Sequence, residues 1–198
     1  MSTQLPPTPD FEAVEAIAPR SAARRTRLLA LLGNLAFSWS NNESLLIYVV
    51  MLLLRTDQAS AAVVFATLNT TRARLDLIQR LAKLHIRDRA HHKSLAALID
   101  RFSECTRLRN EFNHCMYTVD HRGEITHTQS MRIVETRASL RFGEVKPIDA
   151  ARIEEIAKVI QEFKKINREV WALLPRLEIH LKRSRQLNSP AENAAPTR

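Results

Sequence analysis

Apolar residues recur every three or four positions along most of this chain, and no other feature of the sequence constrains its fold as strongly. The longest stripe comprises Ile153, Ile156, Ile160, Phe163, Asn167, Val170, Leu174, Leu177 and Leu181. This spacing places the residues on one side of an α-helix, and that side must be buried against other helices. Asn167, the one polar member, predicts either a register-setting contact in a helix–helix seam or an edge position in an ordinary bundle.

Four helices are expected from this period. The first covers about residues 21–55. The second begins after Asp57 or Ser60, both of which are residue types that cap helix N-termini, and it ends near His85. A charged loop is expected at residues 87–92.

The third helix is expected to begin near Lys93, and the fourth to follow Asp149 and reach residue 182. The stripe of the third helix is Leu95, Leu98, Ile99, Phe102, Cys105, Leu108, Phe112 and Cys115. Four such helices predict an all-α fold, an up-and-down four-helix bundle. Cys105 and Cys115 are predicted to be reduced thiols in its core.

A small β insertion is expected between the last two helices, at about residues 121–146. A turn signal begins at Asp120, and short segments with β-forming residues follow it. We expect a flexible tail at residues 1–15, one helical domain at 16–182 and a basic flexible tail at 183–198. A length of 198 residues agrees with a single domain.

Positive charge predicts an anionic partner. Lys and Arg number 30 against 21 Asp and Glu, which gives a formal net charge of +9. Nucleic acid, an anionic membrane surface and an acidic protein all fit this excess. The residues that we expect to contact nucleic acid, unless they are merely solvated, are Arg72, Arg74, Arg80 and Arg107.

Several classes of function are disfavoured by the composition. The three glycines are too scattered for a glycine-rich phosphate loop, and no zinc-type ligand spacing occurs, so no cofactor and no metal are expected. The longest apolar run, Leu45–Leu54, is much shorter than the ~20 residues that cross a bilayer. The N-terminus has no signal pattern, so a cytoplasmic protein is expected.

Polar side chains of an unusual kind gather late in the third helix: Arg109, Asn110, Asn113, His114 and Tyr117. At ~100° per residue, Asn110 and His114 share a face, and Arg109 and Asn113 form a parallel pair beside them. A solvated face would more often carry Lys and Glu. Ordinary alternatives are a surface salt bridge for Arg109, helix capping for the Asn and His side chains, and packing for Tyr117.

This set of side chains suits a phosphodiester. Arginine offers a fixed charge and a fork of donors that matches phosphate oxygens. Histidine titrates near neutral pH and therefore moves protons. RNA brings its own nucleophile, the 2′-hydroxyl. An acid opposite Arg109 would orient the guanidinium, and Glu43 is the candidate, although a water-exposed helix bend at residues 38–43 is a simpler explanation of its position.

The run Arg109-Asn110-x-x-Asn113-His114, late in a helix of a four-helix bundle, resembles the Arg-x(4–6)-His motif of HEPN domains. Many HEPN domains are metal-independent endoribonucleases of toxin–antitoxin and phage-defence systems. The resemblance implies that His114 transfers a proton, that Arg109 stabilises the transition state and that the product is a 2′,3′-cyclic phosphate. It also implies a homodimer with both motifs at one cleft, and an antitoxin or sensor protein as a further partner.

Two points set limits to this resemblance. The spacing Arg-x4-His also occurs at Arg80/His85, Arg87/His92 and Arg122/His127. In the HEPN toxins that pair with nucleotidyltransferase antitoxins, a tyrosine commonly lies two residues after the histidine, whereas Tyr117 lies three after His114. The alternatives are a non-catalytic HEPN-like module that binds RNA or protein, and a structural protein whose last helix is an assembly seam.

Overall fold

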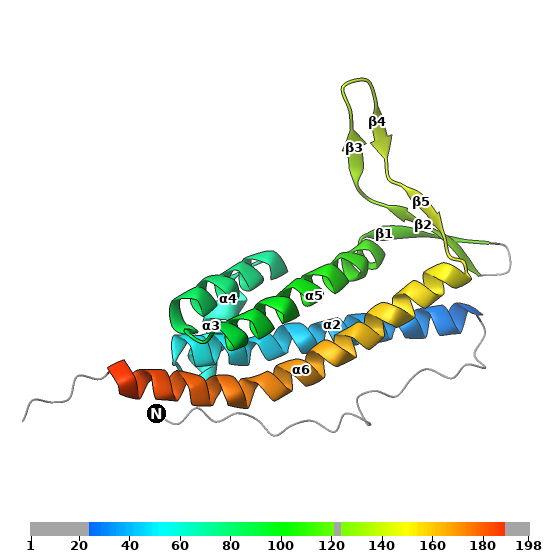
Figure 1. Ribbon diagram of the computed structural model, residues 1–198. Helices are drawn as coiled ribbons and strands as arrows, with labels where there is room; N and C mark the ends of the chain where they lie inside the picture. Colours follow the sequence, from blue (N-terminus) through cyan, green and yellow to red (C-terminus); the bar gives the residue numbers. More distant parts are fainter. Residues whose placement is uncertain (1–23, 121–123, 189–198) are drawn as a thin grey trace, which may run out of the picture. The chain divides into compact units, whose positions relative to one another are not determined.

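The computed structural model describes residues 24–120 and 124–188, which form five helices and five strands (Figure 1). The helices are α2 (Arg24–Leu54), α3 (Gln58–Thr67), α4 (Thr71–His85), α5 (Arg89–Asn113) and α6 (Ala150–Asn188). The described chain is therefore mainly helical with a small antiparallel sheet, as predicted. No single helix in these ranges is long and apolar enough to span a membrane. The helices α2 and α3 taken together have the length and composition of a span, but the chain bends sharply between them.

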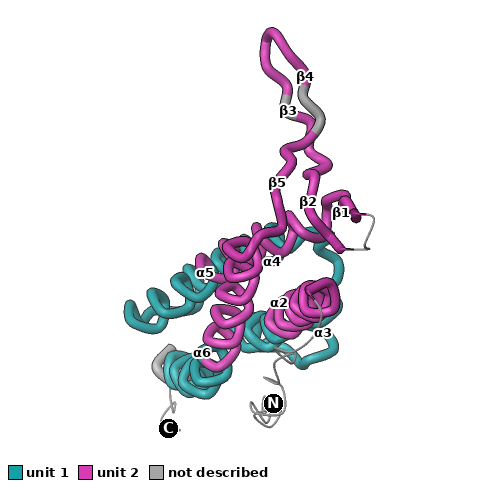
Figure 2. The backbone as a smooth tube through the Cα atoms, turned by 90° about the vertical axis from the view of Figure 1, so that its right-hand side faces the viewer, with its two compact units in different colours: residues 1–7, 45–99, 169–198 teal, residues 8–44, 100–168 magenta. Residues whose placement is uncertain are grey.

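Contacts divide the chain into two compact units, which Figure 2 colours separately. Among the described residues, unit 1 holds 45–99 and 169–188, and unit 2 holds 24–44, 100–120 and 124–168. Helices α2, α5 and α6 each contribute to both units. The expected N-terminal tail, residues 1–15, lies outside the described residues.

Unit 1 contains two helices where the sequence predicted one between Asp57 and His85. Helix α3 begins after Asp57, whose carboxylate accepts from Ser60 N at 2.9 Å, and α4 begins after Thr70, whose hydroxyl accepts from Ala73 N at 3.1 Å. The single-helix prediction is wrong because Thr70 caps a new helix with its side chain, which competes with continuation of the old one.

The stripe of α6 that the sequence predicted is buried, its first half in unit 2 and its second half in unit 1, with one change of member. Ile156, Phe163 and Ile166 are at most 1% exposed, whereas Asn167 is half-buried beside them. Ile166 therefore occupies the core position, and Asn167 lies at the edge of the stripe. Phe163 packs edge-to-face on Phe102 of α5, with ring centroids 5.7 Å apart. The stripe is buried within the chain itself.

Three strands of unit 2 form an antiparallel sheet in the order β1-β2-β5: β1 (Cys115–Val119), β2 (Ile125–Ser130) and β5 (Val145–Pro147). The remaining strands, β3 (Ile133–Glu135) and β4 (Leu140–Phe142), pair with each other as a hairpin that projects from the sheet (Figure 1). The β segment thus begins at Cys115 and not near residue 121 as predicted.

The end of α5 corrects one further prediction. The helix stops at Asn113, so Cys115 and Tyr117 lie on a strand and not on the helical faces assigned to them. β1 pairs with β2 from Cys115↔Ser130 onward, and this non-local pairing replaces the last helical turn. Both cysteines are free, Cys105 buried and Cys115 half-buried.

Two helix boundaries also differ from the expected ones. Helix α5 begins at Arg89, within the expected charged loop, because the Asp88 carboxylate accepts from His91 N at 2.8 Å and caps the first turn. Helix α6 continues to Asn188, so the first residues of the expected flexible tail, 183–188, are helical. Residues 189–198 lie outside the described ranges.

Candidate functional site

Arg109 lies on an aromatic platform built within unit 2. Its guanidinium carbon is 3.6 Å from the centroid of the Trp39 ring, which is the stacked geometry of a cation–π contact. The indole Nε1 donates to Thr106 Oγ1 at 3.1 Å, and that hydroxyl donates to Phe102 O at 2.7 Å. The hydrogen bond to Thr106 fixes the Trp39 ring, and the fixed ring in turn gives the guanidinium of Arg109 a defined position.

Two asparagines hold the guanidinium in that position. Arg109 Nη1 donates to Asn110 Oδ1 at 2.9 Å. With the Asn113 amide oriented by its hydrogen-bonding pattern, its oxygen accepts from Arg109 Nε at 3.2 Å and Nη2 at 3.1 Å. These contacts engage Nε, Nη1 and Nη2 of the guanidinium.

Glu43 is buried, with 8% of its surface exposed, and does not lie on a water-exposed bend. Its negative charge acts on Arg109: burial lowers the pKa of the guanidinium, and the nearby Glu43 opposes that effect. The structure therefore gathers Arg109, Asn113, Trp39 and Glu43 at one place.

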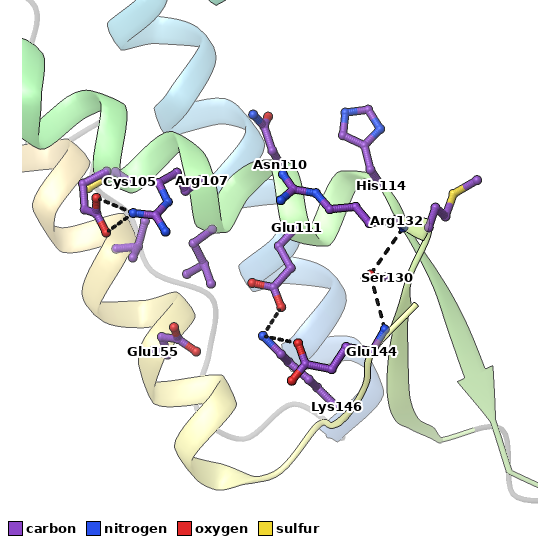
Figure 3. A pocket seen from close by; sticks show the side chains of 14 residues that line it. Cys105, Arg107, Asn110, Glu111, His114, Ser130, Arg132, Glu144, Lys146 and Glu155 are labelled. Atoms are coloured by element: carbon purple, nitrogen blue, oxygen red, sulfur yellow. Dashed lines mark hydrogen bonds and ion pairs between the residues drawn. The ribbon is translucent and has the colours of Figure 1, made fainter. Parts of the chain in front are cut away.

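His114 lies on the other side of the helix end. It is the turn residue between α5 and β1, its backbone N–H donates to Asn110 O at 3.0 Å, and its imidazole is exposed. Asn110 and His114 both line a groove of about 620 Å³, whereas Arg109 does not (Figure 3). The end of α5 thus presents two faces, one centred on Arg109 and one on His114.

The groove lies within unit 2, between the end of α5, the sheet and the start of α6. Its lining residues are Glu104, Cys105, Arg107, Leu108, Asn110, Glu111, His114, Ser130, Met131, Arg132, Glu144, Lys146, Glu155 and Val159. Burial raises the pKa of Cys105 to about 11, so this residue is a neutral thiol at pH 7 and a poor nucleophile.

Ion pairs and a ring contact fix the α5 end against α6 within this unit. Arg152 of α6 pairs with Glu111 at 2.5 Å and with Glu155, and its guanidinium lies 4.6 Å from the centroid of the Phe112 ring. Lys146 of β5 pairs with Glu111 at 2.9 Å. The turn that carries His114 is therefore held by the residues directly before it.

Tyr117 does not join either face. Its hydroxyl donates to Phe112 O at 2.7 Å, and the residue is not among those that line the groove. Burial of the hydroxyl raises the pKa of Tyr117. This side chain ties β1 to the last turn of α5, which is the packing alternative considered for it.

The four arginines expected to contact nucleic acid are distributed over both units. Arg107 lines the groove and pairs at the surface with Glu104, at 3.1 Å. Arg72 and Arg80 are exposed on α4 of unit 1. Arg74 donates through Nε to Phe65 O and Leu68 O, at 3.2 and 3.0 Å, so its guanidinium has a structural task at the end of α3.

Sequence reasoning missed Arg132 and the stacking role of Trp39. Trp39 is 70 positions before Arg109 in the chain, and its sequence neighbours give no sign of that contact. Arg132 lies between β2 and β3, flanked by Met131 and Ile133, and nothing in these neighbours singles it out. Both contacts join segments far apart in sequence, which helical periodicity does not report.

Within residues 24–120 and 124–188, no group of three or more His, Cys, Asp or Glu side chains is arranged to hold a metal ion. Comparison of the chain with protein-family models, with curated proteins and with solved structures finds no match.

Proposed function

We propose that this chain is a metal-independent endoribonuclease of the HEPN type, acting in a toxin or phage-defence setting. The observation that supports this most is the α5 end, where an exposed imidazole, His114, opens onto a groove one helix face away from a fixed cation, Arg109. The helical bundle and the excess positive charge agree with this proposal, and neither is specific to it.

In the proposed reaction, His114 takes the proton from a ribose 2′-hydroxyl as the oxygen attacks the adjacent phosphorus. The bond from phosphorus to the 5′-oxygen breaks, a proton returns to that oxygen, and a 2′,3′-cyclic phosphate remains. Arg109 stabilises the charge that develops on the phosphate, and because it does not line the groove that His114 lines, the proposal requires the homodimer to bring an Arg109 side chain to that groove. One imidazole does not readily serve as base and acid together, so the proposal includes a homodimer that supplies two copies of His114.

The test is cleavage of unstructured RNA in EDTA by the wild type and by His114→Ala and Arg109→Ala. We expect each substitution to lower the rate by about 10²-fold or more, and the wild-type product to end in a cyclic phosphate. The matched control is His127→Ala, because His127 is also exposed, lies on β2 and does not line the groove. A wild type that cleaves no RNA, or cleavage that survives both changes, contradicts the proposal.

A second candidate is a non-catalytic module that binds RNA or a protein. The observation in its favour is that Arg109 already has partners within the chain, namely the Trp39 ring and two asparagine oxygens. This candidate predicts RNA binding that weakens steeply with salt and shows no turnover in the same assay.

A further inference from the structure

Charge in the groove is almost completely balanced within the chain. Four acidic side chains line it, and each has a cationic partner among the described residues. Glu104 pairs with Arg107, Glu111 with both Lys146 and Arg152, Glu144 with Lys146, and Glu155 with Arg152. Four carboxylates therefore share three cations, Arg107, Lys146 and Arg152, and a fourth cation is needed before the charge around the groove is balanced.

The lining cation without such a partner is Arg132. Of the three lining cations, Arg107 and Lys146 are engaged by the acids, whereas no carboxylate of the described residues pairs with the exposed Arg132. Figure 3 shows its side chain extending from the strand side of the groove toward Asn110, beside His114. Arg132 and His114 thus line the same groove, and the guanidinium carries N–H donors that can bind an anion there.

The backbone of Arg132 is held in place and is joined to His114. Arg132 O accepts from Gly143 N at 2.8 Å, and Ser130 Oγ accepts from Arg132 N at 3.4 Å. The next residue toward the N-terminus, Met131, donates its N–H to His114 O at 3.3 Å. The residue next to Arg132 is therefore bonded to the main chain of His114, which holds the backbones of the two residues near each other.

From this juxtaposition we infer that Arg132 binds a phosphate of single-stranded RNA in the groove and presents the adjoining ribose to His114. The inference rests on the proposed function and adds a substrate-binding residue to it. Guanidinium matches phosphate in geometry as well as in charge. In-line attack needs O2′, phosphorus and O5′ aligned, and an unpaired strand can adopt that arrangement in the groove whereas a continuous duplex cannot.

The experiment compares Arg132→Ala, Arg132→Lys and Arg137→Ala in the cleavage assay. Arg137 is the matched control, since it is an exposed arginine of the same hairpin that does not line the groove. We expect Arg132→Ala to raise KM by about tenfold or more, as loss of a charge-assisted hydrogen bond does, with Arg132→Lys between it and the wild type. Arg137→Ala should change KM less than twofold.

Binding gives a second measurement that does not depend on turnover. In the His114→Ala background, the slope of log affinity against log salt for a single-stranded RNA should fall in magnitude by about 0.7 when Arg132 is replaced by alanine. Arg137→Ala should leave that slope nearly unchanged. A duplex RNA of the same sequence should compete poorly with the single strand.

The outcomes separate this inference from the proposed function. If the wild type cleaves RNA and Arg132→Ala behaves like Arg137→Ala, the inference is overturned and the ribonuclease proposal stands. If the wild type cleaves nothing, the ribonuclease proposal fails, and the salt slope alone decides whether Arg132 binds RNA phosphate. Equal competition by duplex RNA overturns the single-strand part. Circular dichroism checks that the variants fold. We expect Arg132→Ala to fold like the wild type, because the Arg132 side chain forms no ion pair with the described residues.

Discussion

At the scale of single residues, Arg109 has a structural task as well as a proposed catalytic one. We expect Arg109→Lys to lower the free energy of unfolding by about 1–2 kcal/mol, because an ammonium stacks less well on Trp39 and lacks the fork that meets two amide oxygens. Urea unfolding measures this change. An Arg109→Lys variant as stable as the wild type would show that the contact with Trp39 does not contribute to stability. The only role left for Arg109 would then be the proposed one in RNA cleavage.

Tyr117 makes the protein sensitive to alkaline pH. Its folded-state pKa is raised because the hydroxyl is buried and because the Cys115 side chain lies beside it. The folded state thus holds this proton more tightly than the unfolded state, whose pKa is about 10. The stabilising contribution is fully present below that pH and is lost as the pH rises above it.

The measurement is tyrosinate absorbance in a Tyr48→Phe background, where Tyr117 is the remaining tyrosine. We expect no tyrosinate signal near pH 10 while the protein is folded, and its appearance together with unfolding at higher pH. The urea concentration at the midpoint of unfolding should decrease as the pH is raised above about 10. Ordinary titration of a folded Tyr117 near pH 10 would contradict the buried hydroxyl.

Sequence reasoning reached part of this residue-scale arrangement. The 100° spacing places Asn110 beside His114 and Arg109 beside Asn113, and the structure has both pairs, the first in the groove and the second on the Trp39 face. Tyr117 was assigned to the same helical line in error, because the helix ends first. Helical spacing is a local rule, and the pairing of β1 with β2 that ends the helix is not local.

At the scale of elements, the break between α3 and α4 depends on Arg74. Its Nε donates to two carbonyls at the end of α3, and its guanidinium lies 4.8 Å from the centroid of the Phe65 ring. We expect Arg74→Gln to lower the free energy of unfolding by about 1–3 kcal/mol. Arg72→Gln, an exposed neighbour, should change it by less than about 0.5 kcal/mol. Equal stabilities in urea would show that Arg74 is a solvated cation like Arg72.

The junction between the sheet and the hairpin depends on Gly143. Its φ is +69°, and a Cβ there would meet Ser130 O at 2.1 Å. Gly143→Ala is therefore expected to cost at least about 1–3 kcal/mol of strain and to shift Arg132, whose carbonyl accepts from Gly143 N. Hydrogen exchange should rise at Gly143 and Ser130, and RNA cleavage should fall, with the helical signal unchanged.

Gly33 provides the opposite control on α2. A Cβ at Gly33 meets nothing within 4 Å, and the residue lies exposed inside a helix. Gly33→Ala should therefore stabilise the protein by about 0.5–1 kcal/mol. If both alanine variants unfold at the same urea concentration, the left-handed conformation assigned to Gly143 is wrong.

The helices were the predictable elements, and their ends were not. Periodicity located α2, α5 and α6 because each repeats its apolar side over many turns. It joined α3 to α4 because Val64, Leu68 and Leu75 continue the period across a break that Thr70 and Arg74 impose through their side chains. The hairpin strands are three residues each, too short for alternation to define them.

At the scale of the whole molecule, positive charge is a weak guide to the site. The net charge is +9, yet the groove holds four acids against three lining cations, and those acids share three cationic partners within the chain. The excess must lie mainly outside the groove, where it attracts RNA at long range without fixing its register. Specific placement then depends on few residues, of which Arg132 and His114 are the ones proposed.

The homodimer is the whole-molecule prediction that the chemistry requires. Sedimentation equilibrium should give twice the chain mass. If each cleft needs two copies of His114, then co-refolding wild type with His114→Ala yields active dimers only where both chains are wild type. Activity per total protein should fall as the square of the wild-type fraction. Co-refolding with Arg137→Ala, whose His114 is intact, should leave activity unchanged.

A linear fall with the wild-type fraction would mean that each protomer acts alone. One imidazole would then have to serve both as base for the 2′-hydroxyl and as acid for the leaving 5′-oxygen, or water would take one of these parts. The two cases also differ in pH dependence. Two copies of His114 in opposite protonation states give a bell-shaped rate profile, whereas a single general base gives a rate that rises to a plateau. Agreement of the mixing curve with the pH profile therefore decides whether the active unit is one chain or two.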